Sequence, residues 1–514
     1  MKKRYGFSTS LLTIGLITAN VSWAQADMPA PQSDAAANTP EDSGGSTDIV
    51  VTARKRSERL LDVPLSVSAA TGDQLAARGV TDVAQLEKVS PGFTYQQSWY
   101  GSPVYSIRGI GFFDNAVSSS PTVTTYVDQV PLPYSAMARG IALDVERVEV
   151  LKGPQGTLFG QNSTGGAANF IAAKPTKDVA AGFDLDLGRF ETVNAQAFVS
   201  GPLAPTLNAR LAVRSESRND WQKGYAPNDS RFGKAPGDEL GDRRFQTARL
   251  LLAWDPSDKV SFVLGANGWR DKSDTIAPRF MEFRPTAALN PFNGATYAAL
   301  TGLPALPKNN RLAGWDADKD FAHDDYFYQF SLNGTLELSD TLNLISISAY
   351  SRYHENSLTE VDGTAFVVGD TRIMADVRSY YQELRLAGEA GRLNWMLGAN
   401  YARDESNEIQ RSTLRGGTNA GVGPFRYTGN EVRNRQDVDT LSGFASADYK
   451  ITDSLNLHGS IRYTDQNRSY AGCLADPGNG TLAAAFNFGF GINAVPGGLP
   501  DHGEPRRPAA DRRG

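Results

Sequence analysis

Along the greater part of the chain, apolar residues recur at every second position, which is the period of a β-strand. In 183–187, phenylalanine and leucine alternate with aspartate. In 380–386, Glu383 and Arg385 fall on one face and the leucines on the other. Each such strand has one apolar and one polar face. The pattern predicts eleven of them, near 181–190, 191–200, 207–217, 244–254, 259–270, 325–338, 341–353, 375–388, 391–403, 437–451 and 454–466.

The connections between these strands are of two lengths that alternate. Short turns are expected at 201–206, 255–258, 339–340, 389–390 and 452–453. Long polar connections are expected at 218–243, 271–324, 354–374 and 404–436. Tight turns at one end and extended loops at the other are typical of a barrel in the bacterial outer membrane. The pattern therefore predicts a transmembrane antiparallel β-barrel.

A different pattern precedes the barrel, between residue 63 and about residue 175. Short β-prone runs mix with two helical stretches, near 72–78 and 83–89. Asp73 and Asp82 stand near the two helix starts, where a carboxylate can accept hydrogen bonds from free backbone N–H groups. This region is predicted to be a compact α+β domain.

The N-terminus has the three parts of an export signal in residues 1–26: a basic cluster, an apolar run and small residues at the end. Residues 27–47 are almost entirely small or polar and predict a flexible periplasmic linker. The β-prone run 48–53 follows abruptly. Such a peptide on a linker is suited to adding a strand to another protein's sheet. Taken alone, it is equally consistent with the first strand of the next domain.

Composition and charge exclude several classes of protein. The formal net charge is −6 and the isoelectric point is about 5.5, which disfavours a nucleic-acid-binding protein. One cysteine, Cys473, and four scattered histidines offer no disulfide framework and no metal-ligand spacing. The longest apolar run is too short for a membrane-spanning helix. The glycine-rich stretches lack a complete nucleotide-binding motif, and a nucleophile elbow is absent, so no enzyme is predicted.

Four runs in the α+β domain carry a resemblance to a known family: 106–111, 124–132, 144–160 and 162–171. They resemble the plug domain of TonB-dependent outer-membrane receptors, most like the siderophore receptors. The run 48–53 resembles the TonB box, with Asp48, Ile49, Val50, Val51, Thr52 and Ala53. The plug signature residues are Arg108, Gly109, Asp128, Glu146, Arg147, Glu149, Lys152, Gly153, Gly156, Gly160, Gly165 and Gly166.

The resemblance implies energy-coupled uptake of a scarce solute at the outer membrane of a Gram-negative bacterium. TonB, with ExbB and ExbD, is the implied partner, and the chain is expected to be a monomer in outer-membrane lipid. A ferric siderophore is the expected ligand, with iron present only as part of the transported chelate and no cofactor. Alternatives are a carbohydrate, cobalamin, haem or aromatic compound, and, in a different class, a passive porin or an adhesin.

Individual site residues are expected on the same basis. Arg108, Glu149, Glu383 and Arg385 are candidates for ion pairs between the plug and the barrel wall, the alternative being simple solvation in a wet lumen. Candidates for ligand contact are Trp99, Tyr100, Phe112 and Phe113 near the plug apex.

The family's barrel has 22 strands, so eleven predict only its N-terminal half. The expected organisation is a plug at 54–178, the half-barrel at 179–470 and an irregular tail at 471–514. This predicts a truncated or frame-shifted chain that breaks within the sixth long loop, which could be non-functional. Completion of the barrel by a second copy is a further alternative.

Overall fold

The computed structural model describes residues 49–98, 103–114, 116–229, 232–284, 300–365, 368–414, 426–452, 454–491 and 493–497. All of them belong to one compact unit, Thr47–Gly514. The expected signal peptide, the linker and Asp48 lie outside the described residues, as does the end of the tail.

The plug domain is built on a five-stranded mixed sheet in the order β3-β8-β9-β6-β7. Thr71 caps the first helix in a capping box with Gln74, and Asp82 accepts a hydrogen bond from the Ala84 amide at the start of the second. The elements are β1 (Val50–Val51), β2 (Glu58–Arg59), η2 (Leu60–Asp62), β3 (Val67–Thr71), α1 (Gly72–Ala77), η3 (Val83–Lys88), β4 (Phe93–Gln97), β5 (Pro103–Ile107), β6 (Val123–Val127), β7 (Val130–Leu132), η4 (Ser135–Ala138), β8 (Val145–Lys152), α2 (Gly156–Phe159) and β9 (Gly166–Ala172).

Backbone crowding explains one glycine of the plug signature. Gly166 has a φ of 143°, and a Cβ there would lie 2.2 Å from the carbonyl oxygen of Leu151 on the paired strand β8. A side chain cannot fit at this distance, so β8 and β9 approach each other only because residue 166 is glycine.

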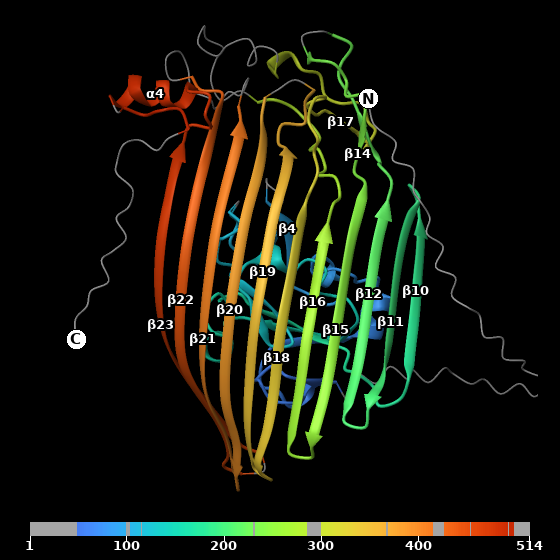
Figure 1. Ribbon diagram of the computed structural model, residues 1–514, viewed down its shortest axis with the longest axis vertical. Helices are drawn as coiled ribbons and strands as arrows, with labels where there is room; N and C mark the ends of the chain where they lie inside the picture. The colour runs from blue at the N-terminus through green and yellow to red at the C-terminus, as the bar shows by residue number, and fades with distance from the viewer. Residues whose placement is uncertain are drawn as a thin grey trace, which may run out of the picture. The chain divides into compact units, whose positions relative to one another are not determined.

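Eleven strands form a second, larger sheet in which each strand pairs antiparallel with the next strand of the same sheet along the chain, which confirms the predicted strand number (Figure 1). The sheet is strongly twisted and curved. Its strands are β10 (Ala180–Gly188), β11 (Thr192–Ala204), β12 (Leu207–Arg218), β15 (Arg243–Ser257), β16 (Val260–Asp271), β18 (Asp325–Ser339), β19 (Leu342–Glu360), β20 (Asp370–Ala390), β21 (Leu393–Thr413), β22 (Gly429–Lys450) and β23 (Asn456–Ala475).

The predicted strand ends are wrong in the second half of this sheet. The segments 354–374 and 404–436 were expected as loops, yet β19 runs to Glu360, β20 starts at Asp370, β21 runs to Thr413 and β22 starts at Gly429. On β20 the alternation continues there with reversed polarity, because Ile373, Ala375 and Val377 are buried in the main core cluster while Asp376 and Arg378 lie on the outer face. The sequence pattern of the lower strand therefore does not extend to its upper end.

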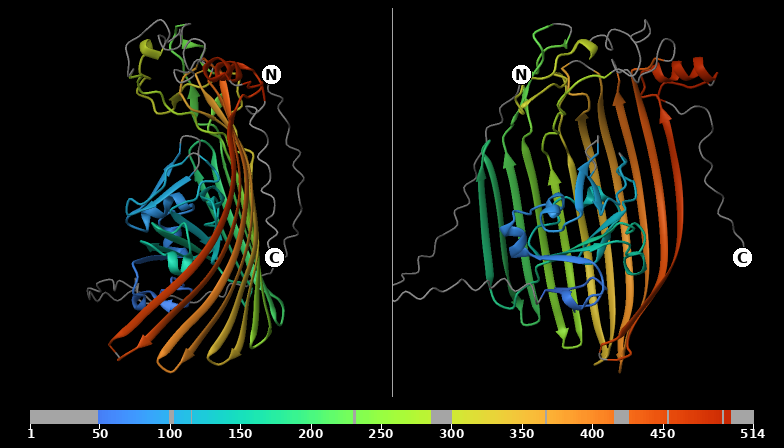
Figure 2. Two further views of the ribbon diagram at one scale, coloured as in Figure 1. Left: turned by 90° about the vertical axis from the view of Figure 1, so that its left-hand side faces the viewer. Right: turned by 180° about the vertical axis from the view of Figure 1, so that it is seen from behind.

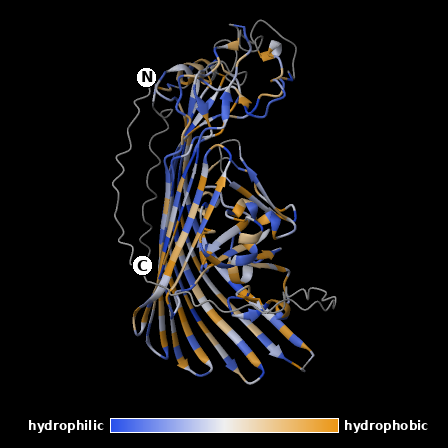
Figure 3. Cartoon of the chain, turned by 90° about the vertical axis from the view of Figure 1, so that its right-hand side faces the viewer, coloured by the Kyte–Doolittle hydropathy of each residue, from blue (hydrophilic) through white to orange (hydrophobic). Residues whose placement is uncertain are grey.

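The two faces of the large sheet differ in polarity. Leu384 is about half exposed on the outer face, whereas Glu383 and Arg385 are buried on the inner face, as the alternation predicts. Hydropathy therefore changes from residue to residue along the strands (Figure 3). The plug lies against the concave inner face (Figure 2), and the main buried cluster contains Phe170 of the plug together with Phe245 and Trp269 of the sheet. The plug thus covers the inner face, which is charged at Glu383 and Arg385 and apolar at Phe245 and Trp269.

The long connections carry structure of their own. β13 (Gln222–Gly224), β14 (Glu239–Leu240) and β17 (Leu312–Ala313) form a small sheet beyond the strand ends. The last strand continues five residues beyond the expected boundary at residue 470, and α4 (Thr481–Phe490) follows it, so this part of the tail is regular rather than irregular. None of the helices in the described part of the chain has the length and apolar character needed to cross a membrane.

Candidate coupling segment and ligand cavity

The segment that resembles a TonB box is folded against the plug. Val50 of β1 pairs with Arg59 of β2, and the Leu60 amide donates to the Ile49 carbonyl oxygen at 2.8 Å. The turn between the two strands places Lys55 in the left-handed region, with a φ of 59°. Residues 49–53 therefore form one arm of a small hairpin.

Thr52 attaches this arm to the plug sheet. Its amide donates to a Glu149 oxygen at 2.8 Å, and its hydroxyl lies 3.1 Å from both oxygens of the same carboxylate. Asn169 donates to the Thr52 hydroxyl at 3.3 Å, and Arg147 donates to Glu149 at 2.8 Å. Glu149 is completely buried, so its charge is balanced by Arg147 and by hydrogen bonds from the coupling segment.

Lys55 attaches the hairpin to the barrel wall. Its ammonium group lies 2.6 Å and 2.9 Å from the two oxygens of Glu383 on β20, and both side chains are buried. Glu383 also accepts a hydrogen bond from Tyr381 at 2.6 Å and forms an ion pair with Arg385 at 3.0 Å. The ring of Phe444 lies 5.1 Å from the ammonium group. This is a paired, desolvated charge network between plug and wall.

Two more cations of the hairpin meet a second acidic group on the wall. Arg54 lies 2.6 Å and Arg56 3.0 Å from the two oxygens of Asp448 on β22. His458 of β23 lies 2.8 Å from the same carboxylate. We call Arg54, Lys55 and Arg56, with Glu383 and Asp448, the coupling latch.

The four residues expected to pair plug with barrel fall into two groups. Glu383 and Arg385 do face the plug, and Arg385 also donates to Gln129 at 2.8 Å and to the Lys55 carbonyl oxygen at 3.3 Å. Glu149 makes its contacts within the plug, as described above. Arg108 donates to Ser66 of the plug at 2.6 Å. The last two are corrected to plug-internal positions, because Glu149 on β8 faces the segment around Thr52 and Arg108, in the turn after β5, reaches Ser66.

The role of the basic run 54–56 was not foreseen from the sequence. The run itself is conspicuous directly after the β-prone segment, but Lys55 and Glu383 are separated by 328 residues. No local pattern connects them, since the pairing is set by how the plug seats on the wall.

The other signature residues support the plug sheet. Asp128 and Gln129 both have positive φ and form the two-residue turn between β6 and β7. The Asp128 carboxylate accepts from the Ala172 amide at 2.9 Å, and burial raises the pKa of this carboxyl. Arg147 pairs with Glu146 as well as Glu149. Gly153 and Gly160 adopt positive φ at the turns on either side of α2. These residues shape the turns and hydrogen bonds of the plug sheet.

The latch has a defined pH dependence. Burial lowers the pKa of the Lys55 ammonium to about 8 from the ordinary 10.5, although the Glu383 charge raises it. The undocked segment therefore holds this proton more tightly than the docked one, and docking becomes more favourable as pH rises from about 8 to 10.5. We expect a nitroxide label at residue 50 to become less mobile as the pH rises from about 8 to 10.5. Below pH 8, where Lys55 is protonated in both the docked and the undocked state, the mobility of the label should not depend on the titration of Lys55.

The control for this titration is Lys55→Met, which removes the titrating group. The label in that variant should show no pH dependence between 8 and 10.5. A wild-type label that becomes more mobile as pH rises through the window would contradict the assignment.

A cavity of about 720 Å³ lies between the β4–β5 hairpin of the plug and the connection after β16. Arg139 of the plug is ion-paired there with Asp325 at 3.2 Å and Asp271 at 3.6 Å, and packs over the Trp269 ring. The cavity thus combines aromatic surface with fixed charges, as small-molecule sites commonly do. Its lining includes Tyr95, Tyr105, Arg139, Asp271, His323 and Glu360.

Of the aromatic residues expected to contact a ligand, the two that the structure describes, Phe112 and Phe113, are not among the lining residues of this cavity. Phe112 and Phe113 are about half exposed on the plug surface after β5. Trp99 and Tyr100 lie outside the described residues. The cavity was not predicted because its walls come from stretches far apart in the chain, among them 82–105, 271–278 and 359–361.

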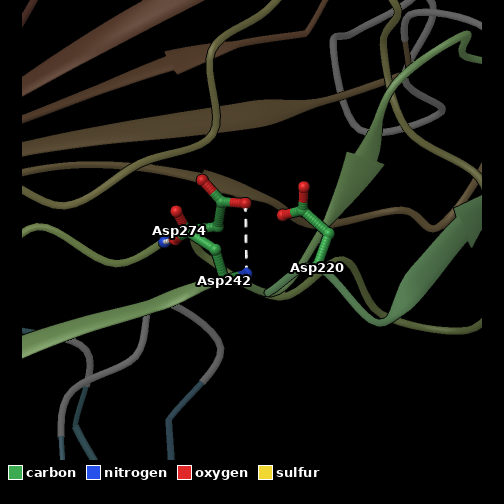
Figure 4. Close-up of side chains that lie close together, drawn as sticks. All are labelled: Asp220, Asp242 and Asp274. Carbon is green, nitrogen blue, oxygen red and sulfur yellow. Dashed lines mark hydrogen bonds between the residues drawn. The ribbon is translucent and has the colours of Figure 1, made fainter. Parts of the chain in front are cut away.

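Three aspartates meet beside this cavity: Asp220, Asp242 and Asp274 (Figure 4). Their carboxylate oxygens lie within 4.8 Å of one another. Asp274 accepts hydrogen bonds from the Gly241 amide at 3.1 Å and the Asp242 amide at 3.3 Å. Burial, together with the neighbouring carboxylates of Asp242 and Asp220, raises the pKa of Asp274 to about 7. The cluster is therefore a site that retains a proton.

Replacing Asp274 by asparagine should stabilise the loops around it. The folded loops hold a proton that the unfolded chain releases between about pH 3.8 and 7, so wild-type loop stability falls as pH rises through that window. The asparagine keeps the acceptor oxygen without the charge. We expect amide hydrogen exchange in 232–242 and 272–284 to be slower than wild type at pH 8, by several-fold, and equal at pH 4. Faster exchange in the variant at pH 8 would contradict this.

Comparison with known proteins is consistent with this architecture. The family described as TonB-dependent Receptor Plug Domain matches residues 59–167. The pesticin receptor of Yersinia pestis is 25% identical over 443 residues, which cover 85% of this chain and 58% of the receptor. The ferripyoverdine receptor of Pseudomonas aeruginosa is 27% identical over 178 residues, or 34% of this chain and 20% of that receptor.

Two solved structures have the same fold. The ferric yersiniabactin uptake receptor FyuA from Yersinia pestis superposes with a TM-score of 0.60 at 18% identity, covering 80% of this chain and 61% of that one. The ferripyoverdine receptor of the outer membrane of Pseudomonas aeruginosa superposes with a TM-score of 0.58 at 16% identity, covering 85% and 57%. The chain thus spans little more than half the length of the relatives it resembles.

Proposed function

We propose that this chain, a TonB-dependent siderophore-receptor-like protein with a plug domain and an eleven-stranded partial barrel, takes part in energy-coupled uptake of a scarce solute across the outer membrane. The proposed solute is a ferric siderophore, because the relatives include the ferripyoverdine receptor and the ferric yersiniabactin uptake receptor FyuA, beside the pesticin receptor. TonB, energised through ExbB and ExbD, is the proposed partner.

The observation that carries the proposal is the docked coupling segment. Residues 49–53 pack on the plug sheet while Lys55 holds the same hairpin to the barrel wall. A passive pore does not require a short β-strand that can detach from the plug and bind a partner protein. A strand that is released when the latch opens can pair with a partner's sheet edge.

A second cavity, of about 610 Å³, lies where withdrawal of the hairpin would open space between the plug and the barrel wall. It borders the hairpin, and its walls include Thr52, Lys55 and Arg56 on one side and Asn343 and Asn394 of the barrel on the other. Withdrawal of the hairpin would widen this polar space. A force on the coupling segment would therefore be applied next to a cavity that already separates the plug from the barrel wall.

The proposal is tested by measuring the chain in purified outer membranes of iron-starved and iron-replete cells. Peptides that increase on iron starvation, together with uptake of a ferric chelate that stops when TonB is deleted, are the expected results. Equal abundance in both conditions would favour a non-iron solute. Absence of the chain from the outer membrane would contradict the proposal as a whole.

A further inference from the structure

The cationic side chains that line the cavity of about 720 Å³ are already paired with the barrel wall. Arg139 is engaged by Asp271 and Asp325, as described above. Arg243 lies 3.4 Å from the same Asp271, and His323 lies 2.9 Å from the same Asp325. Each of these cations therefore has a carboxylate partner within the protein.

The remaining carboxylates of the cavity lining belong to Asp82, Asp274 and Glu360. Asp82 is engaged at the start of η3 and has the cationic Arg214 as a neighbour. Asp274 and Glu360 differ from it, because each lies in a group of further carboxylates. These two positions give the cavity its excess of negative charge.

Asp274 belongs to the cluster of three aspartates with Asp220 and Asp242 (Figure 4). Arg244 donates to Asp242 at 2.6 Å, and Arg218 is a second cation that attracts Asp242. Three carboxylates thus share two cations. Of these five residues, only Asp274 lines the cavity.

Glu360 lies in the other acidic group, at the end of β19. It is directly opposite Asp370 on β20 and close to Asp316 and Asp362, while Lys319 pairs with Asp370 at 3.3 Å. One Glu360 oxygen accepts two backbone amides, but the other accepts no hydrogen bond from the described residues, although the residue is only 2% exposed. A buried acceptor of this kind is costly until a donor reaches it.

The plug contributes aromatic rings to the same cavity. Tyr95 of β4 and Tyr105 of β5 both line it, are directly opposite each other, and have ring centroids 6.0 Å apart. Ring faces attract ammonium and guanidinium groups, as carboxylates do. Aromatic rings on the plug and excess carboxylates on the wall are together suited to an organic cation.

We propose that this cavity selects a solute that carries a protonated amine or guanidinium group, which pairs with Glu360 and is attracted by Asp274, while its carbon skeleton packs against Tyr95 and Tyr105. An anionic group would meet the excess of carboxylates instead. The chelate would therefore carry a positive charge away from its iron. The inference rests on the proposed function, since it takes the cavity as the solute site, and it narrows the class of solute.

The test is equilibrium binding to the purified full chain in detergent, followed by quenching of tryptophan fluorescence. The two probes are a ferric trihydroxamate that ends in a primary amine and the same chelate with that amine acetylated. The wild-type chain should bind the amine form at least tenfold more tightly. Glu360→Gln and Asp274→Asn should each reduce this preference to less than threefold. Both should bind the acetylated form within twofold of wild type, which also shows that they are folded.

The matched control is Glu355→Gln. Glu355 is also a buried glutamate of β19, but it accepts hydrogen bonds from Tyr353 and Ser357 and does not line the cavity. The preference for the amine form should change by less than twofold in this variant.

Four results would overturn the proposal. They are equal affinity of the wild-type chain for the two forms, tighter binding of the acetylated form, an unchanged preference in both folded cavity variants, and binding of neither form. The assay contains no TonB and does not depend on iron-regulated expression. An energy-coupled receptor for an anionic chelate would pass the uptake experiments and fail this one, so the two failures are distinguishable.

Discussion

Replacing Val50 by proline should abolish energy-dependent uptake while the affinity for the solute stays at its wild-type value. Proline lacks the N–H that a strand donates to its neighbour, so the coupling segment can no longer pair fully with a partner's sheet edge. Ligand capture is unaffected because the cavity beside Tyr95 and Arg139 lies on a different part of the plug. Uptake of radiolabelled ferric chelate and equilibrium binding to isolated outer membranes measure the two quantities.

The matched control for this prediction is Val50→Ala. The Val50 side chain is 43% exposed, so truncating it removes little packing and leaves the backbone donor in place. This variant should take up solute at more than half the wild-type rate. Wild-type uptake by the proline variant would refute the role of 48–53 as the coupling segment.

Replacing Glu383 by glutamine should undock the coupling segment in the absence of ligand. The substitution leaves Lys55 and Arg385 as two buried positive charges without their shared partner. Breaking a buried ion pair by removing one member costs roughly 3–5 kcal/mol. That cost is avoided if the hairpin moves out and Lys55 reaches water. We expect the mobile fraction of a nitroxide label at residue 50 to change from a minority to a majority.

The effect of Lys55→Met should be smaller than that of Glu383→Gln. Glu383 keeps Arg385 and Tyr381 as partners in this variant, and methionine can pack against Phe444 where the ammonium group lay. Adding Lys55→Met to Glu383→Gln should restore part of the docked population, since one of the two unpaired charges is gone. Equal mobility of the label in Glu383→Gln and in wild type would contradict the claim that the coupling latch holds the hairpin to the barrel wall.

Much of the fold could be predicted from the sequence because the barrel imposes a strict alternation. A strand with lipid on one side and the plug on the other must alternate, and 380–386 does so with Glu383 and Arg385 facing inward. The prediction failed at the ends of β19 to β22. Near the long loops the polarity of the two faces is reversed: on β20, Ile373 and Val377 are buried in the core cluster while Arg378 is exposed, so the pattern of 380–386 does not predict that the strand continues.

The candidate sites were less accessible to sequence reasoning. The coupling segment could be recognised as a β-prone run, although the run alone is equally consistent with a first strand of the plug. In the structure it pairs with β2 in a two-stranded sheet of its own. Its anchoring could not be recognised, because Lys55 meets Glu383 and Asp448 meets Arg54 across more than 320 residues. The ligand cavity likewise depends on loops brought together by the sheet and not on a motif.

The most direct measurement of the central claim is a site-specific cross-link between cysteine at residue 50 and TonB in living cells. The account predicts little cross-linking without ligand, a several-fold increase when ligand is added, and cross-linking without ligand in Glu383→Gln. A chain that is present in the outer membrane and binds solute, yet shows no cross-link to TonB in any of these states, would contradict it.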